Sequence, residues 1–369
     1  MKLKKTQESK ISLFVPEGRI YDASVFYNPE GELNRDISVA AIETFQKEFK
    51  ERITVCDALA GTGVRGLRYA KEIKGIKKVA LNDKNPLAVK LIKKNIKENK
   101  LSKKCIASWE DANLFLRKNV FNVIDLDPFG SPNIFIDSVA RSIYHKGFLC
   151  VTATDQAALS GTYPKTTLRK YGIKSIDTEF YNELGVRILI TFIMLNLARY
   201  DRAFIPVLSF STKHYYKVFG RIEHAGKITK LLEDFGYANY CQVCGDRNFG
   251  KIEKFDDKNH VFMNCGLIYL GKINDKKFCK NVLKDIKKRD FKFVKDEEKL
   301  LKLIIEEAEM PPFFYDLHVI SKKLKIDTPR FEVFMKKLKE KGFKASRTHF
   351  CLTAIKTDAD YENFCKSLK

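Results

Sequence analysis

Long apolar runs and an apolar leader are lacking from this sequence of 369 residues. No stretch of 18 or more residues is continuously apolar, so we expect no membrane span and no membrane partner. Residues 1–8 are polar and do not resemble a secretory signal. Internal repeats and low-complexity tracts are also lacking. We therefore expect a soluble cytoplasmic protein and, because nothing points to a protein partner, a monomer.

A disulfide framework is not expected, although the chain has nine cysteines, because cytoplasmic thiols stay reduced. Cys241, Cys244 and Cys265 resemble part of a zinc knuckle, but a structural zinc site needs four ligands. The position that would complete a second CxxC motif is Phe262, and His260 is the nearest substitute. These cysteines are either ligands of a structural zinc ion or buried thiols around a β-turn.

Acidic residues are outnumbered by basic ones, 46 against 68, which gives a formal net charge of +22. Such a surplus favours a polyanionic partner such as nucleic acid, because phosphate contacts release counterions. A lysine-rich proteome would produce the same surplus on any surface. Charge alone therefore indicates a nucleic-acid partner without deciding it.

The length of the chain predicts two domains, because single hydrophobic cores seldom grow this large. We place the boundary after residue 272, where a lysine-rich stretch begins. Residues 273–369 contain 24 basic and 16 acidic residues, a denser surplus than in residues 1–272. Helical patterns followed by the strand-like residues 344–348 predict a small α+β, winged-helix-like domain, with residues 346–350 on its wing.

The first domain alternates short apolar runs with amphipathic stretches. Strands are predicted at 53–57, 79–83, 104–107, 122–127 and 147–155, with helices between them. This rhythm indicates a doubly wound, Rossmann-like α/β sheet that is mostly parallel. Residues 204–211 and 215–223 are expected to add two antiparallel strands, and residues 12–28 to form a hairpin or a pair of short strands. The helix predicted at 180–199 is apolar enough to be buried.

Residues that can bind a nucleoside follow the first predicted strands. Asp57 ends one strand, and the motif Gly61-x-Gly63-x-x-Gly66 then leads into a helix, an arrangement that lets the backbone approach a ligand closely. Asp83 ends the next strand, where a carboxylate can bind both hydroxyls of a ribose. The pair Asp111 and Ala112 follows the third strand. Asp111 can accept the exocyclic amine of adenine, or it can be a plain acid at a helix N-terminus.

The fourth strand ends at Asp127-Pro128-Phe129-Gly130. Proline biases the residue before it to an extended conformation, so Asp127 is expected to be the last strand residue. In an open α/β sheet, ligands bind at the carboxyl ends of the strands. A carboxylate, a free carbonyl and an aromatic ring at that edge can hold a flat molecule that carries an N–H group. The alternative is a strand-ending turn with a solvated carboxylate.

In this order, the motifs resemble those of class I methyltransferases that use S-adenosylmethionine. Five blocks together resemble the tRNA (guanine-26-N2)-dimethyltransferase family, and they lie at residues 25–29, 34–36, 127–132, 152–155 and 347–350. The resemblance covers about residues 20–358. It implies two methyl transfers to N2 of one guanine in tRNA. A methyltransferase for adenine N6 or a different guanine is the alternative, and an NAD-dependent oxidoreductase would leave the Asp127 motif without a role.

The resemblance also implies roles for individual residues. The family's cofactor positions match Arg35, Arg65, Asp83, Asp111 and Ala112, in the same site as Asp57, Gly61 and Gly63. Arg35 and Arg65 are expected to reach the methionine carboxylate. Asp127 is expected to accept an N2–H hydrogen bond while the Pro128 carbonyl orients the amine. Phe129 and Phe26 are candidates to sandwich the base.

Overall fold

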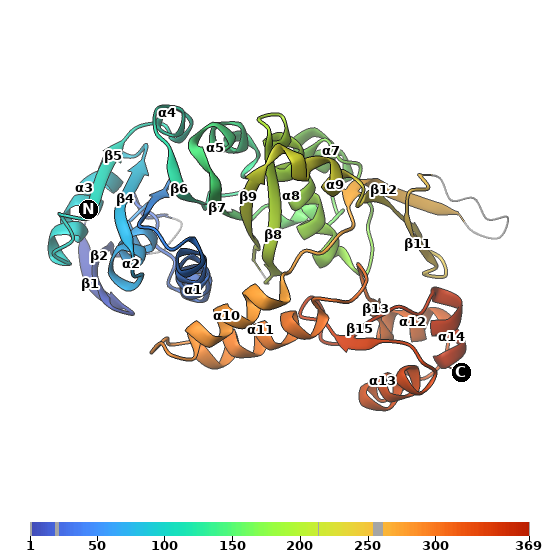
Figure 1. Cartoon of the computed structure of the whole chain (residues 1–369). Helices are drawn as coiled ribbons and strands as arrows, with labels where there is room; N and C mark the ends of the chain where they lie inside the picture. The colour runs from blue at the N-terminus through green and yellow to red at the C-terminus, as the bar shows by residue number, and fades with distance from the viewer. Residues whose placement is uncertain (1, 19–21, 213, 254–260, 369) are drawn as a thin grey trace.

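The computed structural model describes residues 2–18, 22–212, 214–253 and 261–368 (Figure 1). Its centre is a seven-stranded sheet with the strand order β5-β4-β3-β6-β7-β9-β8. The strands are β3 (Ile53–Asp57), β4 (Ile76–Asp83), β5 (Cys105–Trp109), β6 (Phe121–Leu126), β7 (Ile143–Ala153), β8 (Arg202–Ser211) and β9 (Tyr216–His224). Pairing is parallel from β5 to β7 and antiparallel for β9 with both β7 and β8. The predicted doubly wound sheet and its two antiparallel strands are therefore confirmed.

Alternate residues of each central strand face opposite layers of helices, as the pleat requires. Val55 and Val123 pack toward one layer, and their neighbours Cys56 and Ile124 pack toward the other. The first layer holds α1 (Glu32–Phe49), α2 (Val64–Glu72) and α3 (Pro86–Glu98). The second holds α4 (Ala112–Lys118), α5 (Ile136–Ser142) and α8 (Tyr181–Ala198). Near-continuous apolar runs in the strands follow from burial on both faces.

The apolar helix α8 packs across the second layer, as its sequence predicts. It is long and apolar enough to cross a membrane by composition, but 67% of it is buried inside the fold. The short helices α6 (Gln156–Leu159) and α7 (Pro164–Tyr171) precede it. α8 is thus accounted for as the core helix of this layer.

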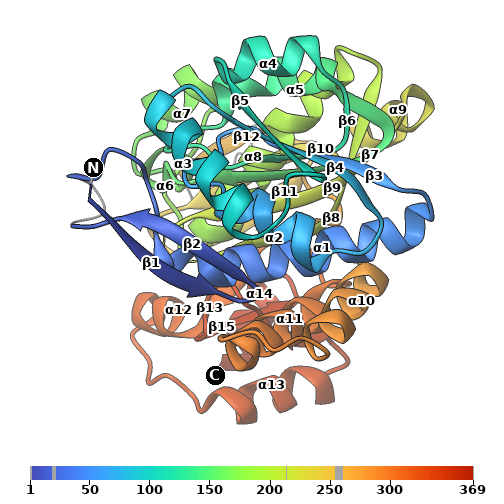
Figure 2. The ribbon, with the colours of Figure 1, turned by 90° about the vertical axis from the view of Figure 1, so that its left-hand side faces the viewer.

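The N-terminal hairpin lies earlier than predicted. Its strands are β1 (Leu3–Glu8) and β2 (Ile11–Pro16), paired in register without a bulge, and it lies against α2 and α3 (Figure 2). β1 was not recognisable by alternation because most of its side chains are polar and only Glu8 is buried. The short helix η2 (Pro29–Gly31) then leads into α1.

A small antiparallel sheet extends from the end of the molecule opposite the hairpin (Figure 1). It consists of β10 (Phe235–Cys241), β11 (Arg247–Gly250) and β12 (Phe262–Tyr269), with β10 in the middle, and follows η4 (Ala225–Lys227) and α9 (Ile228–Leu232). The Tyr269 N–H donates to Thr191 Oγ1 on α8 at 2.8 Å, which anchors this sheet to the core.

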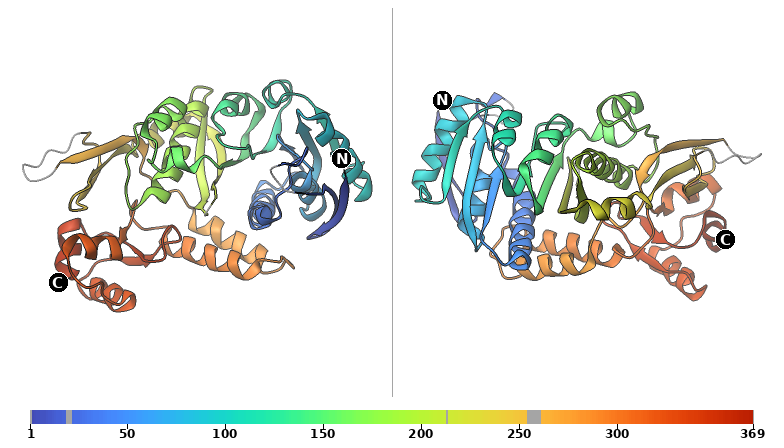
Figure 3. Two further views of the ribbon diagram at one scale, coloured as in Figure 1. Left: turned by 180° about the vertical axis from the view of Figure 1, so that it is seen from behind. Right: turned by 45° about the horizontal axis from the view of Figure 1, so that its top comes forward.

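The helices α10 (Lys276–Ile286) and α11 (Val294–Glu307) lie side by side beneath α1 (Figures 2 and 3). Their buried residues, among them Phe278, Val282 and Leu301, belong to the same apolar cluster as α1 and the central sheet. The predicted boundary after residue 272 stays a prediction. In terms of packing, however, α10 and α11 are part of the larger core.

The remaining C-terminal residues form a separate small core with the predicted winged-helix order. They comprise β13 (Tyr315–Asp316), α12 (Leu317–Leu324), α13 (Phe331–Glu340), β14 (Ala345–Arg347), β15 (Ala354–Thr357) and α14 (Tyr361–Leu368). The three strands pair antiparallel in the order β13-β15-β14. Thr348 and the His349 side chain are buried rather than displayed on an exposed wing, because both contact Glu307 at the end of α11.

Candidate active site

Three aspartates mark the carboxyl edge of the central sheet. Asp57 and Asp83 end the parallel strands β3 and β4, and Asp127 follows β6 on the other side of β3. This is the edge at which open α/β sheets bind ligands. The structure therefore brings the predicted residues of the glycine turn, the ribose acid and the Asp127 motif to one side of the sheet.

The glycine turn between β3 and α2 has a conformation that needs its glycines. Gly61 and Gly63 have φ angles of 53° and 82°, in the left-handed region. At Gly66, a Cβ atom would lie 2.9 Å from the Leu81 side chain, so only glycine lets α2 approach β4 this closely. The Gly66 N–H donates to Asp57 Oδ2 at 2.9 Å, and burial raises the pKa of Asp57 to about 7. Asp57 therefore braces the turn from inside.

Asp83 is fixed by two backbone donors. The N–H of Gly61 donates to Oδ2 at 2.8 Å, and the N–H of Asn85 donates to Oδ1 at 2.8 Å. The carboxylate is half-buried, so its orientation is set while its remaining lone pairs face the edge. This arrangement suits a carboxylate that binds vicinal hydroxyls, as the sequence predicts.

Asp111 is the N-cap of α4. One of its oxygens, Oδ1, accepts from the N–H groups of Asn113 and Leu114, at 2.9 and 3.3 Å. The interpretation of Asp111 as an acid at a helix N-terminus is thus confirmed. The cap uses Oδ1, and no contact to Oδ2 is found within the described chain, so a contact of Asp111 and the buried Ala112 with adenine stays a prediction.

Asp127 is held by Arg65, which reaches it from the first turn of α2. Arg65 Nη2 donates to Asp127 Oδ2 at 2.5 Å, while Nη1 donates to Asp125 Oδ2 at 3.1 Å. Asp125 and Asp127 point to the same face because they are two residues apart on an extended segment. Burial opposes ionisation of Asp127, but the positive charges of Arg65 and then Lys217 outweigh it and hold its pKa below the usual range. Asp127 is therefore a carboxylate at neutral pH.

Arg35 faces the N-terminal hairpin. Its Nε and Nη2 donate to the two carboxylate oxygens of Glu8, both at 2.6 Å, and Nη2 also donates to the Asn28 carbonyl. Arg35 and Glu8 are both buried, and Arg68 also pairs with Glu8 at 3.1 Å. The predicted role of Arg35 toward a cofactor carboxylate stays a prediction. Its partner Glu8 had no recognisable signal in the sequence, because Glu8 lies 27 residues away in a polar strand.

Phe26 and Phe129 meet directly above this edge. Their ring centroids are 4.2 Å apart and their planes are inclined by 83°, which is an edge-to-face contact. Two parallel rings that sandwich a base would be about 7 Å apart, roughly twice the usual stacking distance of about 3.5 Å. The predicted sandwich is therefore not preformed. The Phe129 side chain is 69% exposed and Pro128 is buried behind it.

The loop that carries Phe129 is anchored to the end of β7 and to α7. The Gly130 N–H donates to Thr154 Oγ1 at 2.7 Å, and the Thr154 N–H donates back to the Gly130 carbonyl at 3.0 Å. Ser131 Oγ donates to the Tyr171 hydroxyl at 2.7 Å, and that hydroxyl donates to Asp155 at 2.8 Å. The sequence indicates residues 152–155 as a block, but it does not predict that Thr154 and Asp155 hold this loop in place.

A family model for N2,N2-dimethylguanosine tRNA methyltransferases matches residues 4–369 of this chain. The chain belongs to this family. A Methanosphaera stadtmanae protein named tRNA (guanine(26)-N(2))-dimethyltransferase is 41% identical, with 95% of this chain and 93% of that protein covered. A relative of the same name from Methanothermobacter thermautotrophicus is 38% identical, with 95% of each chain covered. The solved structure of Trm1 from Pyrococcus horikoshii with S-adenosyl-L-methionine is similar at a TM-score of 0.90 and 35% identity, with 100% of both chains covered.

Of the three candidate zinc ligands, Cys241 and Cys244 lie together, but Cys265 does not join them. Cys241 pairs with Phe262 across β10 and β12, whereas Cys265 pairs with Ala238, three residues back along β10. At about 3.4 Å per residue, Cys265 is about 10 Å from the level of Cys241. No three potential ligands cluster in the described part of the chain. The predicted thiolate set is therefore corrected, and His260 lies outside the described residues.

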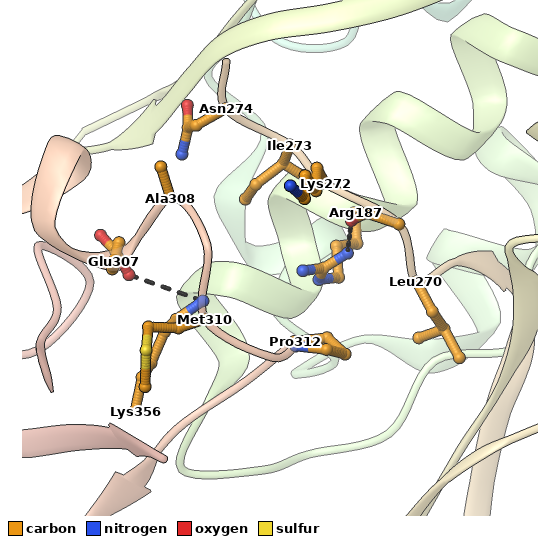
Figure 4. Close-up of a pocket in the computed structure, with 11 residues that line it drawn as sticks. Arg187, Leu270, Lys272, Ile273, Asn274, Glu307, Ala308, Met310, Pro312 and Lys356 are labelled. Atoms are coloured by element: carbon orange, nitrogen blue, oxygen red, sulfur yellow. Dashed lines mark hydrogen bonds and ion pairs between the residues drawn. The ribbon is translucent and has the colours of Figure 1, made fainter. Parts of the chain in front are cut away.

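A second cluster of charges joins α8 and α11 to β15 of the C-terminal core. Lys356 on β15 pairs with Glu307 on α11 at 3.5 Å (Figure 4). Lys356 also pairs with Glu183 on α8 at 2.8 Å, and Glu183 pairs with Arg187 at 2.7 Å. Glu307 accepts from Thr348 at 2.6 Å and contacts the His349 ring. Lys356, Glu183 and Glu307 are buried, and Lys356 and Glu307 line a cavity of about 170 Å³. This cluster, and not the active site, contains Thr348 and His349 of the block at 347–350.

Proposed function

We propose that this chain transfers methyl groups from S-adenosylmethionine to the exocyclic N2 of guanine 26 in tRNA, forming N2-methylguanine and then N2,N2-dimethylguanine. The observation that carries the proposal is the ionised carboxylate of Asp127 beside two aromatic rings at the ligand-binding edge. Membership of the family and the names of the relatives agree with it.

The residues at the sheet edge fit S-adenosylmethionine. The turn at Gly61 and Gly63 has no side chains to block a close approach, and Asp83 is oriented for a ribose. Asp111 and Ala112 lie at the following strand end, where the adenine is expected. When bound, the cofactor supplies an electrophilic methyl group on a positively charged sulfur. Arg65 pairs with both Asp125 and Asp127, so it places a positive charge at the reacting edge.

Asp127 is suited to activate the amine through a hydrogen bond. The lone pair of guanine N2 is delocalised into the ring, so the amine is a poor nucleophile. A carboxylate that accepts one N2–H hydrogen bond favours a pyramidal nitrogen with its lone pair localised on N2, and it fixes the direction of attack. Oδ2 is engaged by Arg65, which leaves Oδ1 for this contact. The Pro128 carbonyl follows directly and can orient the same amine.

The charge state of Asp127 also defines the route of the released proton. Because its pKa lies below the usual range, Asp127 does not retain a proton at neutral pH. The side chain is 31% exposed, so a proton accepted from the methylated amine passes on to water. After the first transfer one N–H remains on the amine. The same carboxylate therefore serves the second transfer without rearrangement.

The tRNA is expected to present guanine 26 as an extruded base, because a paired or stacked base is out of reach of the sheet edge. We propose that basic side chains of the C-terminal winged-helix core bind the tRNA backbone, among them Lys336 and Lys339 on the exposed face of α13. Phosphate contacts of this kind orient the substrate and add affinity without reading sequence.

Asp127→Asn tests the proposal, because amide and carboxylate differ in charge but hardly in shape. We expect turnover to fall by about a hundredfold or more, while cofactor affinity by calorimetry and the melting temperature stay close to wild type. Asp137→Asn on α5 is the matched control, since that carboxylate is partly exposed and pairs with Arg117 away from the edge. Mass spectrometry of treated transcripts identifies the product nucleotide.

Three outcomes would contradict the proposal. Retention of more than a tenth of wild-type turnover by Asp127→Asn rules out the role of its carboxylate. Methylation of a transcript in which adenine replaces guanine 26, with none on the unaltered transcript, assigns the enzyme to adenine N6 instead. Methylation at another guanine in both transcripts would assign a different position.

A further inference from the structure

A closed ring of polar side chains lies directly behind Asp127. Arg65 donates to Asp127 and to Asp125, as described above. Lys217 Nζ on β9 donates to Asp125 Oδ1 at 2.9 Å and to Thr152 Oγ1 at 3.1 Å. The Thr152 side chain lies beside Asp127, where it helps to hold the pKa of that carboxyl below its usual range. The path therefore runs from Asp127 through Arg65, Asp125, Lys217 and Thr152 back to Asp127.

The direction of each hydrogen bond in the ring is fixed by chemistry. An ammonium group can only donate, so Thr152 Oγ1 must accept from Lys217. The single hydroxyl hydrogen of Thr152 is then free to donate to Asp127. A guanidinium also only donates, so Asp127 accepts from Arg65 on one side while the Thr152 hydroxyl has its hydrogen available on the other. Lys217 thus determines the donor that Thr152 presents to the reacting carboxylate.

The strand pairing places these side chains together. Thr152 and Lys217 are directly opposite in the antiparallel pair of β7 and β9, so their side chains share one face of the sheet. Asp125 and Lys217 are fully buried, and Thr152 is 2% exposed. Asp125 also accepts from the Tyr69 hydroxyl on α2, one turn after Arg65. A buried lysine requires this degree of pairing, because an unpaired charge in the interior is costly.

We propose that Lys217 and Asp125 are positioning residues for methyl transfer, which act through Thr152 and Arg65 to hold the Asp127 carboxylate in one orientation. The proposal rests on the proposed function. Asp127 follows the last residue of β6 and is partly exposed, so the strand itself does not fix its side chain. Arg65 engages one carboxylate oxygen, which leaves the other oxygen, and one direction, for the incoming amine.

Seven ionisable groups besides Lys217 face Asp127 or its partners from the surrounding elements. Arg65 and Tyr69 come from α2, Asp125 from β6, Cys56 and Asp57 from β3, Cys150 from β7 and Tyr215 from the segment before β9. Lys217 is one of two cations in this set, and the three aspartates Asp57, Asp125 and Asp127 outnumber them. Loss of the Lys217 charge removes a positive charge that lowers the pKa of Asp127. The acid limb of the pH profile of kcat should therefore move to higher pH.

Lys217→Met and Thr152→Val test the proposal, alone and together. Lys217→Met removes the charge at similar length, and Thr152→Val removes only the hydroxyl at constant shape. We expect each to lower kcat by about tenfold to a hundredfold, because small displacements of a reacting group have effects of this size. The KM values for cofactor and tRNA should stay within about threefold. Since both act through one ring, the double variant should lose less than the product of the two.

A crystal structure of Thr152→Val without cofactor gives a readout independent of turnover. We expect the Asp127 carboxylate to rotate toward Arg65 or to occupy two orientations. Lys78→Met is the matched control, because Lys78 lies on β4, is exposed and donates to the Lys103 carbonyl. An unchanged kcat and acid limb in folded Thr152→Val, or an unmoved Asp127 in its crystal, would overturn the positioning role. Absence of guanine methylation by wild type would instead overturn the proposed function, and the crystal readout would still stand.

Discussion

The rings of Phe26 and Phe129 touch edge to face across the candidate active site, with centroids 4.2 Å apart. Phe26 precedes α1 and Phe129 follows β6, so the contact closes the edge between two segments that are far apart in the chain. Aromatic pairs in this geometry contribute about 0.5–1.5 kcal/mol beyond their buried area. Admission of a guanine between them requires one ring to move, and the exposed Phe129 is the one with room to do so.

Replacement of Phe129 by Ala is expected to weaken use of tRNA without destabilising the fold. Stacking of a base on an aromatic ring is worth about 1–3 kcal/mol, so kcat/KM should fall by roughly 5-fold to 150-fold. The melting temperature should change little, because the side chain is 69% exposed. Val120→Ala at the amino end of the same strand, where the side chain is 45% exposed, is the control for loss of an exposed apolar group. Steady-state kinetics with tRNA would contradict the stacking role if Phe129→Ala matched that control.

The cluster around Glu307 is expected to make stability depend on acid pH. Burial opposes ionisation of Glu307, but His349 and Lys356 lower its pKa from 4.5 to about 2. A depressed pKa in the folded state contributes stability that is present above about pH 4.5 and is lost as pH falls toward 2. Glu307→Gln should therefore lose about 3 kcal/mol at neutral pH, and this difference from wild type should shrink in acid. Urea unfolding at several pH values measures it.

Glu309→Gln is the control for the Glu307 prediction, because Glu309 is exposed and pairs only with Lys272 among the described residues. This control should match wild type at every pH. A difference between wild type and Glu307→Gln that stays constant from neutral pH into acid would show that shape, and not the carboxylate charge, is what Glu307 supplies.

Glu297 on α11 should have the opposite pH dependence. Burial and, after it, the neighbouring Asp36 on α1, which pairs with Arg68, raise the pKa of Glu297 to about 9. A raised pKa means that the folded state binds a proton that the unfolded state releases above about pH 4.5. Wild-type stability should then fall between about pH 4.5 and 9. Glu297→Gln keeps a neutral hydrogen-bonding group, so its advantage over wild type should grow as pH rises.

Urea unfolding of Glu297→Gln and of Glu298→Gln checks this prediction across the same pH range. Glu298 is the next residue and pairs with Lys302 on the surface, so its replacement should not produce a growing advantage at high pH. A variant at 297 that is less stable than wild type at alkaline pH would show that Glu297 is ionised in the fold.

Local patterns were sufficient for the elements of the central sheet and for part of the site. The glycine turn lies between a strand and a helix that are adjacent in sequence, so Gly61 and Gly63 were predictable from residues within one βα unit. The ion pairs that define the site were not predictable in this way. Arg65 and Asp127 are 62 residues apart, and Lys217 and Asp125 are 92 residues apart, so only the sheet order brings each pair together.

Register and burial explain the interpretations that changed. Cys241 and Cys265 have the spacing of metal ligands in sequence, but the pairing of β10 with β12 separates them. The block at 347–350 is placed near a wing by its position between two strands. Thr348 and His349 turn inward because Glu307 supplies a buried carboxylate that both can bind. The pattern of residues within one segment gives no information about a partner, such as Glu307, that lies in another segment.

The C-terminal basic surface is best tested by point substitutions, because truncation at residue 273 would remove Phe278 and Val282 from the main core. Lys336→Gln with Lys339→Gln removes two charges from the exposed face of α13 while the buried Leu338 stays in place. Removal of one phosphate-binding charge should reduce the slope of log affinity against log salt by about 0.7–0.9. We therefore expect weaker tRNA binding at low salt and a slope smaller by about 1.5. Lys287→Gln with Lys288→Gln, which follow α10, is the control of equal charge, and an equal change in both double variants would show that net charge alone is responsible.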